Sequence, residues 1–345
     1  MKILFFLSLV VSLNSYGQTC FKETGAKTSK EDPFYKARVA NIGSYRGECY
    51  NNAFRRNAPR FDPSNQADLK TISSLYGLKM KKGKVYLGNF LHRGEYLLAE
   101  YTPGSIERVV MMFEKFIEPM NNIVLTGHTH LRFILKQPIK LYHPTKGLVG
   151  EVKDFNYAMF AVRPMSIKGL TFSPFGDGIK KNYAITHNFM STIDMATEYK
   201  SYAAEGATEV SQYELESFAL DFEKTLQALI NFSDVAYHQA ELAPYHTITN
   251  NCVSNMFVGI ESGDKGVRLA PHDYEGRVII KNNRRFYTPR NPQKGMVKNP
   301  LWILRTLENR GMIITRKANQ RESFNTELCR VLDQAGLAVP KGCSL

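Results

Sequence analysis

The apolar positions along the chain predict a sheet in its middle part. Runs rich in β-branched and aromatic residues recur there, separated by turn residues. The predicted strands are VYLGNF and EYLLAEY within residues 84–101, then residues 123–135 and 152–162. Residues 169–206 contain turns and short polar elements whose periodicity predicts neither a helix nor a strand.

Helical spacing of apolar residues is found at residues 105–118, 211–230 and 299–311. The first of these predicted helices is stopped by Pro119. The second begins with a stretch from Ser211 to Glu214 that has the form of a capping box. The third opens at Pro300 and closes at Gly311. The mixture predicts an α+β fold in which helices pack on a mainly antiparallel sheet.

The stretch YHTITNNCVSNMFVGI, residues 245–260, contains the first candidate for chemistry. Its period changes from strand-like to helical at Asn250-Asn251-Cys252, and since asparagine is a favoured N-cap, Cys252 is placed in the first turn of a helix. Backbone N–H groups and the helix dipole stabilise an anion there and can lower the pKa of a thiol. Cys252 is therefore a candidate nucleophile, and the alternative is a small buried apolar residue.

The first residues of the chain predict export. One lysine, an apolar run from Ile3 to Leu13 and the small residues Ser15 and Gly17 are typical of a signal peptide, residues 1–17. The apolar run is too short to span a membrane, and no later stretch approaches about eighteen uninterrupted apolar residues. We therefore expect a periplasmic or extracellular protein without a transmembrane helix after signal-peptide removal.

All five cysteines follow this segment, an odd number in a compartment that permits disulfide bonds. Cys20 and Cys49 are neighbours near the N-terminus, and Cys329 and Cys343 are neighbours near the C-terminus. We predict these two disulfide bonds and a free thiol at Cys252.

Positive charge is concentrated in one stretch. The formal net charge is +13, and residues 277–298 contain seven basic residues and no acid. Outside the cytoplasm this stretch favours an anionic membrane surface or acidic wall polymers over nucleic acid, and a solvated basic loop is the alternative. The seven residues are Arg277, Lys281, Arg284, Arg285, Arg290, Lys294 and Lys298.

A partner for the thiol is predicted in the strand GHTHLRF. His128, His130 and Arg132 point to one face of this strand, and its apolar residues point to the other. A nucleophilic cysteine needs a base, usually a histidine brought close by folding. The alternative is a mononuclear zinc site made of both histidines and a distant His143 or His246. A binuclear metallophosphoesterase is not favoured, because the other motifs of that family are missing.

The sequence resembles the N-terminal periplasmic domain of the bacterial lipoprotein N-acylation protein Lnb, a family formerly classed as a domain of unknown function. The resemblance rests on GHTHLRF, on YHTITNNCVSNMF, on the long amphipathic helix between them and on the closing PLWILRTLENRGMI. It covers most of residues 85–315. It implies a papain-like core in circularly permuted order, with the family's histidine at His128 and its cysteine at Cys252.

The resemblance also implies thiol acyl-transfer chemistry. Cys252 would attack an ester or amide carbonyl, and His128 would take and return the proton. An oxyanion would be stabilised by Asn251 or by the first-turn N–H groups. The possible supporting residues are Asn251, His130, Asp154 and Asn156, of which Asp154 and Asn156 are candidates to orient His128.

We expect a signal peptide at residues 1–17 and a single α+β catalytic domain at 18–345. The domain is divided into an irregular N-terminal extension (18–84), a core (85–315) and a C-terminal extension (316–345). The expected function is a cell-envelope thiol acyltransferase or hydrolase acting on an ester or amide of a lipid, lipoprotein or wall component, without a cofactor. Lnb-type proteins carry transmembrane segments after this domain and this sequence has none, so transfer and hydrolysis are both open. The alternatives are a non-catalytic envelope-binding module and a zinc hydrolase using the His-x-His strand.

Overall fold

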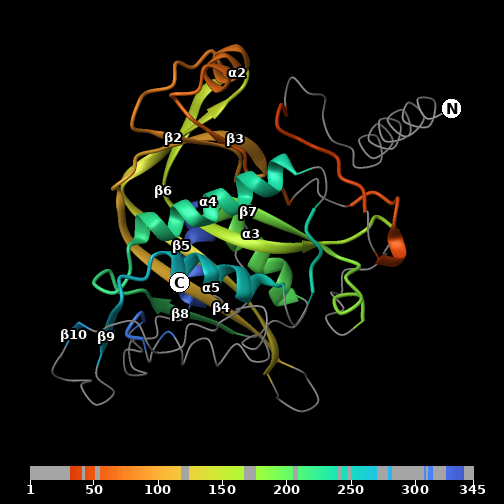
Figure 1. Cartoon of the computed structure of the whole chain (residues 1–345), viewed down its shortest axis with the longest axis vertical. Coiled ribbons are helices and arrows are strands. Elements are labelled where there is room, and N and C mark those ends of the chain that lie inside the picture. Colours follow the sequence, from red (N-terminus) through yellow and green to blue (C-terminus); the bar gives the residue numbers. More distant parts are fainter. Residues whose placement is uncertain are drawn as a thin grey trace.

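The computed structural model describes most of the chain between residues 32 and 337 (Figure 1). The described residues are 32–40, 43–50, 55–117, 124–166, 176–204, 209–239, 242–246, 250–269, 279–281, 307, 310–313 and 324–337. The predicted signal peptide, Cys20, Cys343 and most of the basic stretch 277–298 lie outside these ranges. Most of the helix predicted at 299–311 lies outside them as well.

The main sheet contains eight described strands, and five of them close into a barrel. Strand β3 pairs with both β2 and β5, β5 pairs with β6, β6 pairs with β7, and β7 returns to β2. All of these pairings are antiparallel except that of β2 with β7. Strands β4 and β8 extend the sheet beyond β5, and β1 pairs with β2. The strands are β1 Arg60–Phe61, β2 Val85–His92, β3 Glu95–Tyr101, β4 Ile106–Ile117, β5 Val124–His143, β6 Gly147–Val162, β7 Ala184–Ser191 and β8 Glu209–Glu214, with a separate pair β9 Val267–Leu269 and β10 Ile279–Lys281.

Helices α4 and α5 lie side by side across one face of the sheet (Figure 1). A Cβ atom on Gly259 of α5 would come within 2.4 Å of Leu229 Cδ2 on α4, so glycine permits this close approach. No helix in the described part of the chain is both long and apolar enough to cross a membrane. The helices are η1 Gly43–Tyr45, α2 Gln66–Tyr76, α3 Thr192–Ala204, α4 Phe222–His238, α5 Cys252–Ser262 and α7 Phe324–Gln334.

The two faces of the central strands belong to different cores. Leu131 and Phe133 of β5 pack in the largest apolar cluster, which includes the buried sides of α4 and α5. Met112 of β4 and Phe160 of β6 belong to a second cluster, with Met195 of α3. Because side chains alternate along a strand, odd-numbered residues of this part of β5 face α5 and even-numbered ones face α3.

The α+β architecture with a mainly antiparallel sheet is confirmed, as are the strands predicted at 84–101, 123–135 and 152–162. The helix predicted at 105–118 is wrong, because these residues form β4. Met111 lies in one core and Met112 in the other, so β4 is apolar on both faces. A strand of this kind has no alternation, and its apolar run also matches helical spacing.

The helix predicted from Ser211 begins later, at Phe222. The stretch interpreted as a capping box belongs to β8, and Asp221 caps α4 by accepting a hydrogen bond from the Lys224 N–H at 3.1 Å. The predicted apolar face was right in its second half, where Leu226 and Leu229 are buried.

Two further regions are more regular than expected. The extension 18–84 is not irregular throughout, because α2 lies within it, capped by Asn65 and ended by Gly77 at a left-handed φ of 60°. Residues 169–206 contain β7 and α3, which the pattern did not predict.

Candidate active site

A reciprocal capping box sets the start of α5. Asn251 Oδ1 accepts hydrogen bonds from the N–H groups of Val253 and Ser254, both at 3.0 Å. Ser254 Oγ accepts one from the Asn251 N–H at 3.0 Å. The predicted N-cap is confirmed, and Cys252 is the first residue of the helix.

Cys252 is a free thiol, 7% exposed, in the apolar cluster between α5 and the sheet. It meets β5 at Thr129, whose backbone N–H donates a hydrogen bond to the sulfur. Thr129 lies between the two histidines of the GHTH motif. The structure therefore brings the thiol to the strand from which the base was predicted.

Burial raises the pKa of Cys252 to about 11. The backbone N–H groups of Thr129, Val253 and Cys252 itself favour the thiolate, but they are outweighed by desolvation of the charged sulfur. The expectation of a lowered thiol pKa is therefore wrong for this structure. The helix start is present as predicted, and the thiol is nonetheless protonated at neutral pH.

The two predicted histidines lie on the opposite face of β5 from Thr129. The His128 ring stacks on Phe160, with ring centroids 5.2 Å apart and planes at 17°, and lies 6.3 Å from the ring of His130. Burial first, and then the charge of Arg55, lower the pKa of His128 to about 3. Its Nε2 is buried and has no hydrogen-bond partner among the described residues. The unused nitrogen is an acceptor, but at a pKa of about 3 the buried imidazole is a weak base at neutral pH.

Pairing between β5 and β6 stops beside the thiol. The pairing ends at His130 of β5 and Ala158 of β6. From Met159 to Val162, β6 pairs only with β7. Helix α5 contacts both β5 and β6. The Cys252 sulfur thus takes the place of a strand partner for the Thr129 N–H. His128 is the next residue along this open edge. His128 Nε2 makes no hydrogen bond to Cys252 in the described structure. Direct contact between the two side chains therefore stays a prediction.

The predicted supporting residues Asp154 and Asn156 have other partners. Asp154 accepts hydrogen bonds from Arg132 Nε at 2.7 and 2.8 Å and from Thr192 Oγ1 at 2.6 Å. Asn156 Nδ2 donates to Thr192 Oγ1 at 2.8 Å. These contacts join β5 and β6 to the first residue of α3, and they leave the orientation of His128 to its stack on Phe160.

A further buried histidine, His187 on β7, was missed. Its Nδ1 lies 2.7 Å from the Tyr157 hydroxyl, and its ring lies 6.3 Å from that of Phe232 on α4. Burial lowers its pKa to about 4. Because β7 is buried along its whole length, no alternation marks the residue, and a histidine within an apolar strand was the available signal.

The other cysteines are consistent with a free thiol at position 252. Cys49 and Cys329 are disulfide-bonded. Their predicted partners, Cys20 and Cys343, lie outside the described residues, so the pairing stays a prediction.

The zinc alternative finds no third ligand in the described part of the chain, where no three His, Cys, Asp or Glu side chains are placed to hold a metal ion. His143 accepts a hydrogen bond from the Thr145 N–H at 3.1 Å, and the backbone of His246 pairs with that of Asn250.

Comparison of the chain with protein-family models, curated proteins and solved structures finds no match. The fold and the site therefore define the class by themselves. It is an α+β protein with a five-stranded barrel, against which a capped helix places a buried free thiol.

Proposed function

We propose that the protein is an exported cysteine acyltransferase or hydrolase of the cell envelope, with Cys252 as nucleophile and His128 as general base. The observation that carries the proposal is the position of the Cys252 thiol, at the first residue of a capped helix and hydrogen-bonded to the neighbour of His128. A helix-borne cysteine packed against a barrel strand that supplies histidine supports a papain-like core. The order would be circularly permuted, because His128 precedes Cys252.

The two pKa shifts favour a neutral thiol and a neutral imidazole before reaction. The proton then passes from sulfur to His128 as the sulfur attacks the carbonyl carbon, and the carbonyl electron pair moves to oxygen. Collapse of this intermediate expels the alcohol or amine, which takes the proton from the imidazolium. Water or an acceptor nucleophile then attacks the thioester by the same steps in reverse, releasing the acyl group and the thiol.

These reaction steps require the His128 ring to turn from Phe160 toward the thiol. The open edge of β5 supports such a rotation, because β6 no longer pairs with the strand there. The buried Nε2 loses no described hydrogen bond when the ring turns. The stacking contact that is given up is worth about 1 kcal/mol, and contact with the thiol and substrate would offset it.

We assign the oxyanion to the Cys252 N–H, which lies beside the sulfur. The N–H groups of Val253 and Ser254 already donate to Asn251 Oδ1. Asn251 therefore acts in the proposal as a positioning residue that holds the helix start, while the Cys252 N–H lies beside the reacting sulfur.

We propose as substrate an ester or amide of a lipid, lipoprotein or wall component. The basic stretch 277–298, largely outside the described residues, would draw the protein to anionic surfaces.

Hydrolysis of p-nitrophenyl acetate and p-nitrophenyl butyrate tests the role of His128. His128→Ala is expected to lower kcat/KM by a factor on the order of 10²–10⁴, the usual contribution of a general base. His143→Ala is the matched control, since it removes a histidine from the far end of the same strand. It should leave kcat/KM unchanged.

A zinc hydrolase predicts a different result. It would bind stoichiometric zinc, and both His128→Ala and His130→Ala would lose the metal together with activity. That outcome would exclude the thiol mechanism in favour of zinc-dependent hydrolysis. If His128→Ala hydrolyses the esters at pH 7 as fast as the wild type does, His128 is not the general base.

A further inference from the structure

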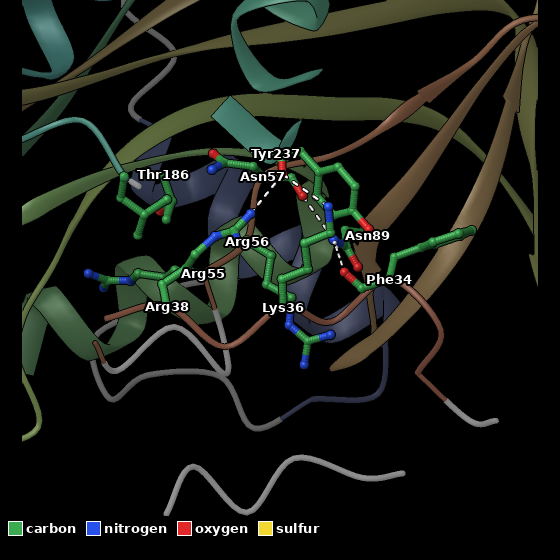
Figure 2. Close-up of a pocket in the computed structure, with 10 residues that line it drawn as sticks. Phe34, Lys36, Arg38, Arg55, Arg56, Asn57, Asn89, Thr186 and Tyr237 are labelled. Atoms are coloured by element: carbon green, nitrogen blue, oxygen red, sulfur yellow. Dashed lines mark hydrogen bonds between the residues drawn. The ribbon is translucent and has the colours of Figure 1, made fainter. Parts of the chain in front are cut away.

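A basic cavity lies where the N-terminal segments meet β7 and the end of α4. Its lining includes four cationic side chains, Lys36, Arg38, Arg55 and Arg56, and the described residues of the lining include no carboxylate. Figure 2 shows these side chains lying together beside Asn57 and Tyr237. A cavity of one sign of charge concentrates ions of the other sign.

Buried polar contacts hold the cation-bearing segments in place. Asn89 Nδ2 donates to the backbone carbonyls of Phe34 at 3.1 Å and Asn57 at 2.8 Å, and so joins both segments to β2 (Figure 2). Asn57 Oδ1 accepts from the His187 N–H at 2.7 Å. Asn89 has a left-handed φ of 53° at a register shift in β2, a strained conformation for a residue other than glycine. The cations are therefore presented by an ordered frame.

Arg56 and Arg55 meet carboxylates that lie outside the cavity lining. Arg56 donates to Asp32 Oδ1 at 2.6 Å, and Arg55 donates to Glu198 Oε2 at 3.4 Å. These pairs fix the guanidinium groups and compensate part of their charge.

Lys36 and Arg38 converge on one backbone carbonyl. Arg38 donates to the Tyr237 carbonyl oxygen at 2.7 Å and Lys36 donates to it at 3.3 Å. Burial lowers the pKa of both side chains, and the charge of Arg38 lowers that of Lys36 further, although Asp234 acts against this. Lys36 and Arg38 repel each other at the carbonyl that they share, so a bound anion would stabilise the charged form of both.

The size of the cavity limits the anion to a small head group. The cavity volume is about 20 Å³, room for about one water-sized group. One oxygen atom of a phosphoryl group can enter such a space while the rest of the molecule stays at the mouth. Arginine and lysine are the side chains that bind phosphoryl oxygens in proteins.

Arg55 connects this cavity to the proposed active site. Its guanidinium carbon lies 4.5 Å from the centroid of the Phe160 ring, on which His128 also stacks. A molecule anchored at Arg55 would therefore have its remaining part near the proposed base.

We propose that this cavity binds the phosphoryl group of the protein's substrate, a phosphate-bearing ester or amide whose acyl carbonyl lies near His128. The substrate role rests on the proposed function, whereas phosphoryl binding does not. The phosphate of a lipid head group and that of a soluble phosphate ester share this chemistry.

Thermal unfolding in sodium phosphate or in sodium chloride of equal ionic strength tests the binding. Phosphate is expected to raise the Tm of the wild type, and the Lys36→Gln/Arg38→Gln variant should need about tenfold or more phosphate for the same rise. Lys81→Gln/Lys82→Gln is the matched control, because it removes the same charge from an exposed turn. An equal phosphate effect in all three proteins, or none in any, would overturn the proposal.

A second measurement uses the wild type alone, so it does not depend on a folded variant. Acetic anhydride labelling of lysines is mapped by mass spectrometry, with Lys82 as the internal reference. Glycerol 3-phosphate or phosphatidate vesicles should protect Lys36 relative to Lys82. The probe that protects identifies the source of the phosphate, and protection by neither contradicts the proposal. Cys252→Ala should bind phosphate like the wild type, so loss of the acyl chemistry and loss of this site are distinguishable.

Discussion

Replacing Cys252 with alanine is expected to lower p-nitrophenyl ester turnover by a factor on the order of 10³ or more, because no other group would form the acyl-enzyme. Cys252→Ser should be nearly as inactive, since a buried hydroxyl is a far weaker acid than a thiol. The free energy of unfolding of Cys252→Ala should fall by only about 1 kcal/mol, as expected for removal of one buried sulfur. Stopped-flow turnover and urea unfolding measure the two effects.

Val253→Ala is the matched control for this prediction. Val253 is buried in the same helical turn, so its truncation should lower the free energy of unfolding by about 1–2 kcal/mol while leaving turnover nearly intact. A structural cysteine gives the reverse pattern, with Cys252→Ala losing stability and keeping turnover.

Acidification is expected to destabilise the fold between about pH 6.5 and pH 4. Burial depresses the folded-state pKa of His187 to about 4 and that of His128 to about 3, and it holds that of His130 well below its usual value. In this window the unfolded chain binds protons at these positions and the folded chain does not. The stability that the neutral histidines contribute is therefore complete above pH 6.5, and the free energy of unfolding falls as the pH decreases below that value. His187 alone contributes on the order of 3 kcal/mol.

Urea unfolding at pH 7 and pH 4.5 checks this expectation. His187→Gln should show a smaller loss between the two pH values than the wild type, while His143→Gln, from the half-buried end of β5, should follow the wild type. Equal free energies of unfolding for the wild type at both pH values would show that these histidines are not buried in their neutral form.

The parts of the fold that the sequence predicted well depend on neighbours along the chain. The start of α5 was found because Asn251 is a capping residue followed by apolar residues at helical spacing. Strand β5 was found because polar and apolar residues alternate at His128, His130 and Arg132. Strand β4 was missed because burial on both faces removes that alternation, and closure of the barrel through β2 and β7 joins residues nearly a hundred positions apart.

In the candidate site, too, the features set by local sequence were predicted and those set by distant segments were not. The position of Cys252 in a first turn follows from local sequence, but its pKa is governed by burial under distant strands, which reverses the expected direction. The partners of Asp154 depend on α3, which the pattern did not resolve. The basic cavity combines Arg38, Arg55 and Tyr237 from separate segments, so no stretch of sequence carries its signal.

Identification of an acyl-enzyme is the most direct test of Cys252 as the nucleophile. The wild type is mixed with p-nitrophenyl butyrate, quenched in acid during turnover, and analysed by intact-mass spectrometry and peptide mapping. We predict one butyryl group per chain, carried on the peptide that contains Cys252, and no such adduct in Cys252→Ala. A butyryl group mapped to another residue, or turnover by Cys252→Ala at the rate of the wild type, would show that Cys252 is not the nucleophile.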